Sequence, residues 1–225
     1  MIKKNLILYH GSRGGIVGNI KPVSRKRCDF GTGFYMGSNQ SQAKSLVSND
    51  PSPYYYKLSL DMKSLDQDRV LRLTDMDWAY FVLFNRGKLE TIKGSNLYMQ
   101  CARMAENKDL IIGPIADDAV NESMNRFLHN QITDKAFLES IHALDYGVQY
   151  VAKTEKACSL ITVIEEKKLI GKELSDALAV SSRSRKKGWL LAEEVQMRYR
   201  REGLFFDEIL SDQLRTVKKK RGKGL

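Results

Sequence analysis

Two short segments near the start of the chain combine residue types that can hold a flat, polar, phosphate-bearing ligand. An apolar stretch, Leu6–Tyr9, leads into His10-Gly11-Ser12, and Asp29-Phe30-Gly31-Thr32-Gly33-Phe34-Tyr35 follows further along. Glycine lets a backbone approach a ligand closely because it has no side chain. Histidine offers a ring nitrogen to a hydroxyl, and aromatic rings offer faces for stacking. The two segments therefore predict a site for a planar ring joined to sugars and phosphates.

Each of these residues also has an ordinary structural interpretation. Gly31 and Gly33 fit a turn, and Phe34-Tyr35 fits a core. The glycine pair lacks the third glycine and the strand–helix–strand context of a Rossmann fingerprint, and no Gly-Lys-Ser/Thr phosphate loop occurs. Arg27 either faces a pyrophosphate or forms part of a solvated basic turn. The ordered combination, rather than any single residue, favours the ligand site.

Composition favours a globular protein with a polyanionic partner. The 225 residues are 42% hydrophobic and carry a net charge of +10, and a chain of this length can bury a sizeable core. Residues 1–48 carry +7 and residues 171–225 carry +6, whereas residues 49–170 carry −3. A basic excess of this kind favours nucleic acid, dinucleotide phosphates or an acidic protein, although it also serves solubility alone.

Cysteine use and hydropathy predict a cytoplasmic protein without metal. The three cysteines and three histidines show no metal-ligand spacing, and widely separated cysteines are typical of a reducing compartment. The sequence contains no apolar run long enough to span a membrane and no secretory leader. We therefore expect no metal and no membrane partner.

Hydrophobic periodicity and breaker residues predict an α+β fold. Strands are expected over 5–9, 54–60, 70–73, 109–115 and 147–153. Helices are expected over 38–47, 76–85, 117–130 and 133–144, with a short helix capped by Thr154. Further helices are expected over 172–180, 188–201 and 205–214, with a basic linker over 181–187 and disorder over 218–225.

Three motifs together resemble a known group of proteins. They are Leu8–Ser12, Asp29–Tyr35 and Gly113–Asp118. In this order they resemble a bacterial domain family, and the segment from Leu8 to Ser45 looks like the N-terminal half of the His-Tyr-Glu class of ADP-ribosyltransferases, the diphtheria-toxin and poly-ADP-ribose-polymerase lineage. The resemblance extends from about Leu6 to Leu160. It implies a split antiparallel sheet with flanking helices in an NAD+-binding domain, residues 1–165, and a basic helical extension, residues 166–225.

The resemblance also implies roles for individual residues. His10 would bind the adenosine ribose, Gly11 would clamp the nicotinamide amide through its backbone, and Tyr35 would stack on nicotinamide. The implied catalytic residues are Gln149, Tyr35 and His10. The implied NAD+-binding residues are His10, Gly11, Ser12, Arg27, Phe30, Gly31, Gly33 and Tyr35.

Gln149 departs from the glutamate that the resembled class carries on its late strand. An amide can hydrogen-bond the ribose hydroxyl, but it stabilises positive charge less than a carboxylate does and cannot act as a general base. Three outcomes stay open: the acceptor needs no base, the base is Asp117 or Asp118, or only binding remains. Those two aspartates also fit the start of the following helix as caps.

The resemblance implies an NAD+-dependent mono-ADP-ribosyltransferase, with NAD+ as substrate and no metal. The expected acceptor is a nucleic acid, RNA above all, or a protein. Small bacterial enzymes that look like this one are often toxins of toxin–antitoxin or phage-defence modules, so an acidic antitoxin is an expected partner. The alternatives are a catalytically silent module that binds NAD, ADP-ribose or RNA, and an NAD+ glycohydrolase.

Overall fold

The structure is a computed structural model that describes residues 5–144 and 146–211. The chain forms two compact units, each made of two segments: residues 1–115 with 146–184, and residues 116–145 with 185–225. This division differs from the predicted boundary at residue 165, which falls inside strand β7 (Ile161–Lys168). Strand β7 pairs with the sheet of the first unit, and the inserted residues 116–145 form one unit with the C-terminal segment.

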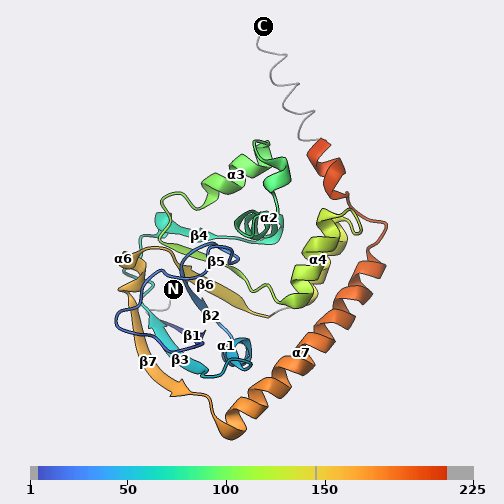
Figure 1. Cartoon of the computed structure of the whole chain (residues 1–225). Coiled ribbons are helices and arrows are strands. Elements are labelled where there is room, and N and C mark those ends of the chain that lie inside the picture. The colour runs from blue at the N-terminus through green and yellow to red at the C-terminus, as the bar shows by residue number, and fades with distance from the viewer. Residues whose placement is uncertain (1–4, 145, 212–225) are drawn as a thin grey trace. The chain divides into compact units, whose positions relative to one another are not determined.

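The first unit is built on a mixed seven-stranded sheet (Figure 1). Its order is β4-β5-β6-β2-β1-β3-β7, and every neighbouring pair is antiparallel except the parallel pair β4–β5. The remaining strands are β1 (Leu6–Ser12), β2 (Phe34–Gly37), β3 (Tyr54–Leu60), β4 (Val70–Arg72), β5 (Leu110–Pro114) and β6 (Val148–Ala152). With the helices described below, this sheet confirms the predicted α+β class.

Strand β1 is longer than its sequence pattern predicts. It continues through Ser12, because His10 and Gly11 pair in register with Tyr56 and Tyr55 of β3. The His-Gly pair therefore lies within a strand and not after it. Strand β7 was not predicted, because all of its residues after Ile161 are exposed and it lacks the apolar alternation that marks a half-buried strand.

The sheet is least continuous between β1 and β2. The register of these strands is defined by one pair, Tyr9 opposite Gly37, whereas β1 pairs with β3 over its whole length. Next to that pair, Nδ1 of His10 lies 2.7 Å from the backbone oxygen of Tyr35. A side chain thus links the two strands at the point where their backbone ladder is not continued.

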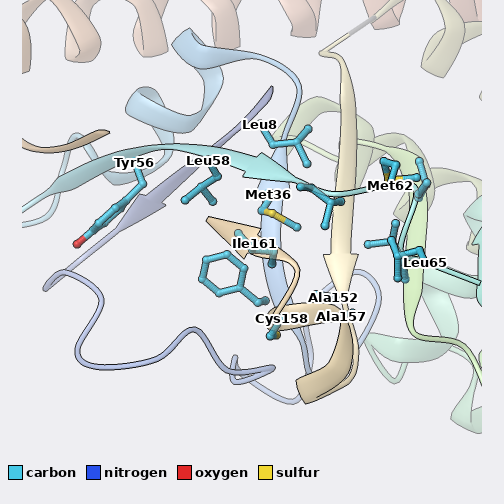
Figure 2. Packing of buried hydrophobic residues seen from close by; sticks show 14 residues of the cluster. Leu8, Met36, Tyr56, Leu58, Met62, Leu65, Ala152, Ala157, Cys158 and Ile161 are labelled. Atoms are coloured by element: carbon cyan, nitrogen blue, oxygen red, sulfur yellow. The ribbon is translucent and has the colours of Figure 1, made fainter. Parts of the chain in front are cut away.

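One face of the sheet carries an apolar core (Figure 2). Leu8 of β1, Met36 of β2 and Leu58 of β3 point to this face from three adjacent strands, and each is almost fully buried. Met62 and Leu65 close the cluster from the loop after β3, and Ala157 and Cys158 close it from helix α6 (Glu155–Cys158). Burial of each large apolar side chain contributes about 1.5–3 kcal/mol, so this cluster is a main source of the unit's stability.

Helices α1 (Gln40–Val47) and α2 (Asp75–Asn85) pack on the other face, and α3 (Asn96–Met104) packs on α2 through Phe84 and Tyr98. Helix α1 begins after Asn39, whose Oδ1 accepts from two backbone N–H groups, and not at Ser38. Ser38 instead accepts a hydrogen bond from the backbone of β6. Helix α2, predicted over 76–85, is apolar on nearly all sides and buried, and Gly87 follows it with φ +73°.

The second unit is helical and contains α4 (Asp118–Leu128), α5 (Asp134–Ala143) and a helical stretch over 206–211. The side chains of Asp117 and Thr133 cap α4 and α5, and the cap at Asp117 confirms one of the two aspartates considered for that role. The rings of Phe127 and Phe137 stack with centroids 5.3 Å apart, and Phe206 packs edge-on against Phe127.

Helix α7 (Gly171–Arg198) is continuous, so the predicted linker over 181–187 is wrong. That stretch contains no glycine or proline, and its arginines and lysines are good helix formers. The predicted helix over 205–214 is described only as far as residue 211, and the predicted disordered tail lies outside the described residues. Within residues 5–144 and 146–211, no helix is both long and apolar enough to cross a membrane.

Candidate functional site

The loop of residues 28–33 packs on one face of β6. Alternate residues along a strand point to the same face, and here that face carries Gln149, Val151 and, directly after the strand, Lys153. A Cβ added to Gly33 would lie 2.5 Å from Cγ1 of Val151. Only glycine permits this approach, so Gly33 is required for the packing of the loop.

Tyr35 anchors the same loop to β2. Its hydroxyl donates to the backbone oxygen of Gly31 at 2.6 Å and accepts from the backbone N–H of Phe30 at 2.9 Å. Burial raises the pKa of the Tyr35 phenol far above its usual range, so the hydroxyl stays protonated. Gly31 has φ +71°, a conformation that favours glycine, and a Cβ there would lie 2.7 Å from Oδ1 of Asn85.

Phe30 has a packing role in the fold, and its predicted ligand contact stays a prediction. Its ring is fully buried, with its centroid 5.9 Å from that of Phe81 on α2. Its N–H bonds to Tyr35, and its carbonyl oxygen accepts from Nζ of Lys153. Both the ring and the backbone of Phe30 are therefore already engaged.

Lys153 is a residue that the sequence interpretation did not include. Its ammonium group is partly buried against the loop, and burial lowers its pKa to about 8. Its position in the sequence could have indicated this role, because the alternation of a strand places Lys153 on the same face as Gln149, directly after the buried end of β6. The amine holds the loop through the carbonyl of Phe30 and adds a titratable group to this face.

Gln149 is buried, with 6% of its surface exposed, and its amide group is held on two sides. Nε2 donates to Oδ2 of Asp29 at 3.1 Å and to the backbone oxygen of Pro114 at 2.8 Å. Both partners are acceptors, so the NH2 group has to face them. Oε1 accepts no hydrogen bond from any described residue and keeps contact with solvent. Gln149 therefore presents an acceptor to any ligand.

Asp29 and Arg86 form the outer part of this network, and neither was named as a site residue from the sequence, although Asp29 belongs to the second motif. Nε of Arg86 donates to Oδ1 of Asp29 at 3.0 Å, and Nη2 donates to the same oxygen. The two side chains are 14% and 22% exposed, so the pair is largely shielded from water. A signal existed in the sequence: Asp29 is the single acidic residue among the first 48.

His10 does not join Tyr35 and Gln149 on their face of the sheet. The centroid of its ring lies 4.6 Å from that of Phe34, which belongs to the core face. Register pairs Tyr35 with Val151, so Tyr35 points to the same side as Gln149. The link between His10 and Tyr35 is the hydrogen bond to the Tyr35 backbone.

The environment of His10 fixes its protonation state. Burial lowers its pKa, so the imidazole is neutral at pH 7. Nδ1 donates its proton to the carbonyl of Tyr35, because a carbonyl can only accept. Nε2 is consequently the acceptor of the ring, able to receive a hydrogen bond from a ligand hydroxyl.

The neighbouring residues of β1 are occupied by the fold. A Cβ on Gly11 would lie 2.4 Å from the backbone oxygen of Ala43, so glycine is needed here for α1 to pack on the strand. Oγ of Ser12 donates to the backbone oxygen of Gly15 at 3.1 Å and closes the following turn. The structure thus gives both residues a folding role and leaves their predicted ligand contacts as proposals.

The predicted phosphate-binding cation, Arg27, is exposed. Its guanidinium lies beside Gly87 at the end of α2 and has no ion-pair partner among the described residues. Asp117 and Asp118, considered as bases, lie in the second unit, where Asp117 caps α4 and Asp118 is 3.7 Å from Arg185. Among the described residues, no three His, Cys, Asp or Glu side chains gather as metal ligands.

The fold and this site define an α+β protein in which a glycine-rich loop packs on a central strand of the sheet. Residues 6–163, more than two thirds of the chain, match the model of a family described as protein of unknown function (DUF3990), and the chain belongs to that family. The match includes all three motifs and Gln149. No curated protein and no solved structure matches the chain significantly.

Proposed function

We propose that this protein is an NAD+-dependent mono-ADP-ribosyltransferase with the split-sheet fold of that class. The observation that carries the proposal is the side chain of Gln149, which keeps an acceptor oxygen open on the strand next to Tyr35. The motif order supports it, because the segments with His10, Tyr35 and Gln149 form the adjacent strands β1, β2 and β6. The discontinuous ladder between β1 and β2 is compatible with a split sheet.

The proposed reaction breaks the bond between nicotinamide and its ribose. The transition state resembles an oxocarbenium ion, and a hydrogen bond from the adjacent ribose hydroxyl strengthens as charge develops. Oε1 of Gln149 would accept that hydrogen bond. Nicotinamide leaves with the bonding electron pair, the acceptor atom bonds to the ribose carbon, and the acceptor's proton passes to a base or to water. Tyr35 would stack on nicotinamide, and Nε2 of His10 would accept from the adenosine ribose.

Charge supports a polyanionic acceptor. The N-terminal 48 residues carry +7, and Arg27 among them is exposed beside the loop that contacts Gln149. Such a basic excess attracts RNA, the favoured acceptor, more strongly than an average protein. We further propose that the protein acts in the bacterial cytoplasm as the toxin of a toxin–antitoxin or phage-defence module, with an acidic antitoxin that covers the basic surface.

The neutral side chain of Gln149 favours a second candidate function. An amide cannot take a proton from an acceptor, and its NH2 is already committed to Asp29 and Pro114. A silent module that binds NAD or ADP-ribose needs no such base. An NAD+ glycohydrolase, with water as acceptor, is the remaining alternative.

One experiment separates these functions. The full chain is incubated with NAD+ labelled in its adenylate half, together with RNA or protein, and nicotinamide release and macromolecular label are measured. Gln149→Ala is compared with Gln131→Ala, a matched change at an exposed position. Label on RNA or protein that is lost only in Gln149→Ala supports the transferase. Free ADP-ribose alone indicates a glycohydrolase, binding without nicotinamide release indicates a module, and absence of binding refutes all three.

A further inference from the structure

We propose that Asp29, clamped by Arg86, is a positioning residue that selects an amide at position 149 and turns its oxygen toward the ligand. The class that the sequence resembles carries a glutamate on its late strand. In this protein the strand carries Gln149, and the carboxylate belongs to Asp29, which accepts a hydrogen bond from Gln149. The proposal rests on the proposed function in so far as the ligand is NAD+. Its structural part, the selection of the amide, does not depend on the ligand.

The first step of the argument is the chemistry of the surroundings of Gln149. A carboxylate oxygen of Asp29 and the backbone oxygen of Pro114 both lie within hydrogen-bond distance of its nitrogen. Neither group can donate a hydrogen bond when Asp29 is ionised. Only a group with two N–H donors satisfies both partners, and among side chains of this length that group is the amide of glutamine.

The second step concerns the charge of Asp29. The guanidinium of Arg86 donates twice to Oδ1, and Oδ2 faces Gln149. The opposite charges of the guanidinium and the carboxylate attract each other at this distance. A glutamate at position 149 would place a second carboxylate beside the first, with one arginine to compensate both, and would also oppose the Pro114 oxygen. The structure therefore excludes an ionised glutamate here without rearrangement.

The third step is what the fixed amide does for a ligand. With both N–H groups engaged, Oε1 is the part of the side chain that remains for an incoming molecule. The ligand group that meets it has to be a donor, such as a sugar hydroxyl, because an anionic or carbonyl oxygen would be repelled. Asp29 also polarises the amide through the hydrogen bond and makes Oε1 a better acceptor.

Gln149→Glu, Asp29→Asn and the double variant that exchanges amide and carboxylate test this arrangement. Gln131→Glu and Asp68→Asn repeat the charge changes at exposed positions. The thermal midpoint of the full-length protein is measured from pH 5 to pH 8, followed by NAD+ affinity at pH 7.5. The other titratable groups near the network, Cys28, Tyr35 and Lys153, are unchanged in all these variants.

Gln149→Glu is expected to lower the midpoint by roughly 5 °C or more at pH 8. The loss shrinks toward pH 5, because a glutamate next to Asp29 has a raised pKa and becomes protonated as the pH falls. The double variant is expected to recover at least half of the loss at pH 8. If Gln149→Glu is as stable as Gln131→Glu across the range, or if the double variant loses as much as both single variants together, the proposal is wrong.

Failure of the proposed function gives a different result. If the wild-type chain binds no NAD+ while the coupling between positions 29 and 149 is found, the enzyme proposal fails and the positioning network stands. If NAD+ binds, Asp29→Asn is expected to weaken binding at least fivefold while Asp68→Asn leaves it unchanged. Turnover then provides a further readout: a positioning role predicts that Asp29→Asn lowers kcat, whereas the exchanged pair recovers part of it. Equal kcat in Asp29→Asn and wild type would contradict that role.

Discussion

Replacement of Tyr35 by phenylalanine separates the two tasks that the fold and the proposed ligand give to this side chain. The hydroxyl bonds the N–H of Phe30 and the carbonyl of Gly31. The change leaves both backbone groups without their partner, at a cost of about 1–3 kcal/mol for a buried group and less where water can enter. We therefore expect a loss of about 2 kcal/mol in unfolding free energy, or roughly 4–8 °C in the thermal midpoint for a unit of this size.

The assay is chemical denaturation of Tyr35→Phe beside Tyr150→Phe. Tyr150 lies on the next strand, is partly buried in the core cluster, and its hydroxyl bonds to no described residue, so this control loses only an idle hydroxyl. Because phenylalanine keeps the ring, stacking on nicotinamide predicts that the NAD+ affinity of Tyr35→Phe changes less than about threefold at temperatures where the variant is folded. Equal stability of the two variants would refute the assigned clamp, and a large loss of affinity in the folded variant would refute stacking as the main contribution.

Three further predictions concern stability. Lys153, with a pKa of about 8, binds its proton less tightly in the folded than in the unfolded state. The unfolding free energy of the wild type should therefore rise by about 2 kcal/mol between pH 8 and pH 10. Lys153→Met should lack this rise when denaturation is measured across the same pH range. Gly11→Ala should cost about 1–3 kcal/mol from the clash with Ala43, whereas Gly14→Ala, with open space around it, should cost little in the same assay. The hydrogen-bonded ion pair with Arg69 lowers the pKa of the buried carboxyl of Asp109. Asp109 therefore stabilises the fold above the ordinary aspartate pKa, and this contribution is lost as the pH falls through the lowered value. Asp109→Asn should make the unfolding free energy less dependent on pH on the acid side.

Secondary structure could be predicted wherever one physical signal dominated. The aromatic and alternating sequence of residues 54–60 predicted β3 with correct bounds, and residues suited to capping indicated where α4 and α5 begin. Strand β7 gave no such signal, because an exposed edge strand has no buried face to impose a period. The break expected in α7 failed for a related reason: a basic run between two helical patterns is also an ordinary exposed helix face.

The candidate site could be predicted only in part. The loop around Gly31 and Gly33 and the strand with Gln149, which the sequence analysis names as candidate site segments, are adjacent in the structure, and their ligand roles stay predictions. The partner of Gln149 was out of reach, because Asp29 is 120 residues away and only the tertiary fold brings the two side chains together. The sequence also could not show that His10 points to the other face, since that depends on the register between strands.

The opposite orientation of His10 and Gln149 restricts the kind of molecule that could use both. The ring of His10 packs on the core side, whereas Oε1 of Gln149 belongs to the side covered by the loop and α2. The ladder between β1 and β2 is defined by one pair, Tyr9 opposite Gly37, and the side chain of His10 bridges the two strands beside that pair. A compact ligand such as a single nucleotide would reach one of the two residues. A dinucleotide has two nucleoside ends joined by a flexible pyrophosphate, so its two riboses are far enough apart to meet one acceptor each, Nε2 and Oε1. If one ligand contacts both His10 and Gln149, as the resemblance implies, their opposite orientation requires an extended molecule with hydroxyl donors at both ends, and this requirement favours NAD+ over smaller nucleotides.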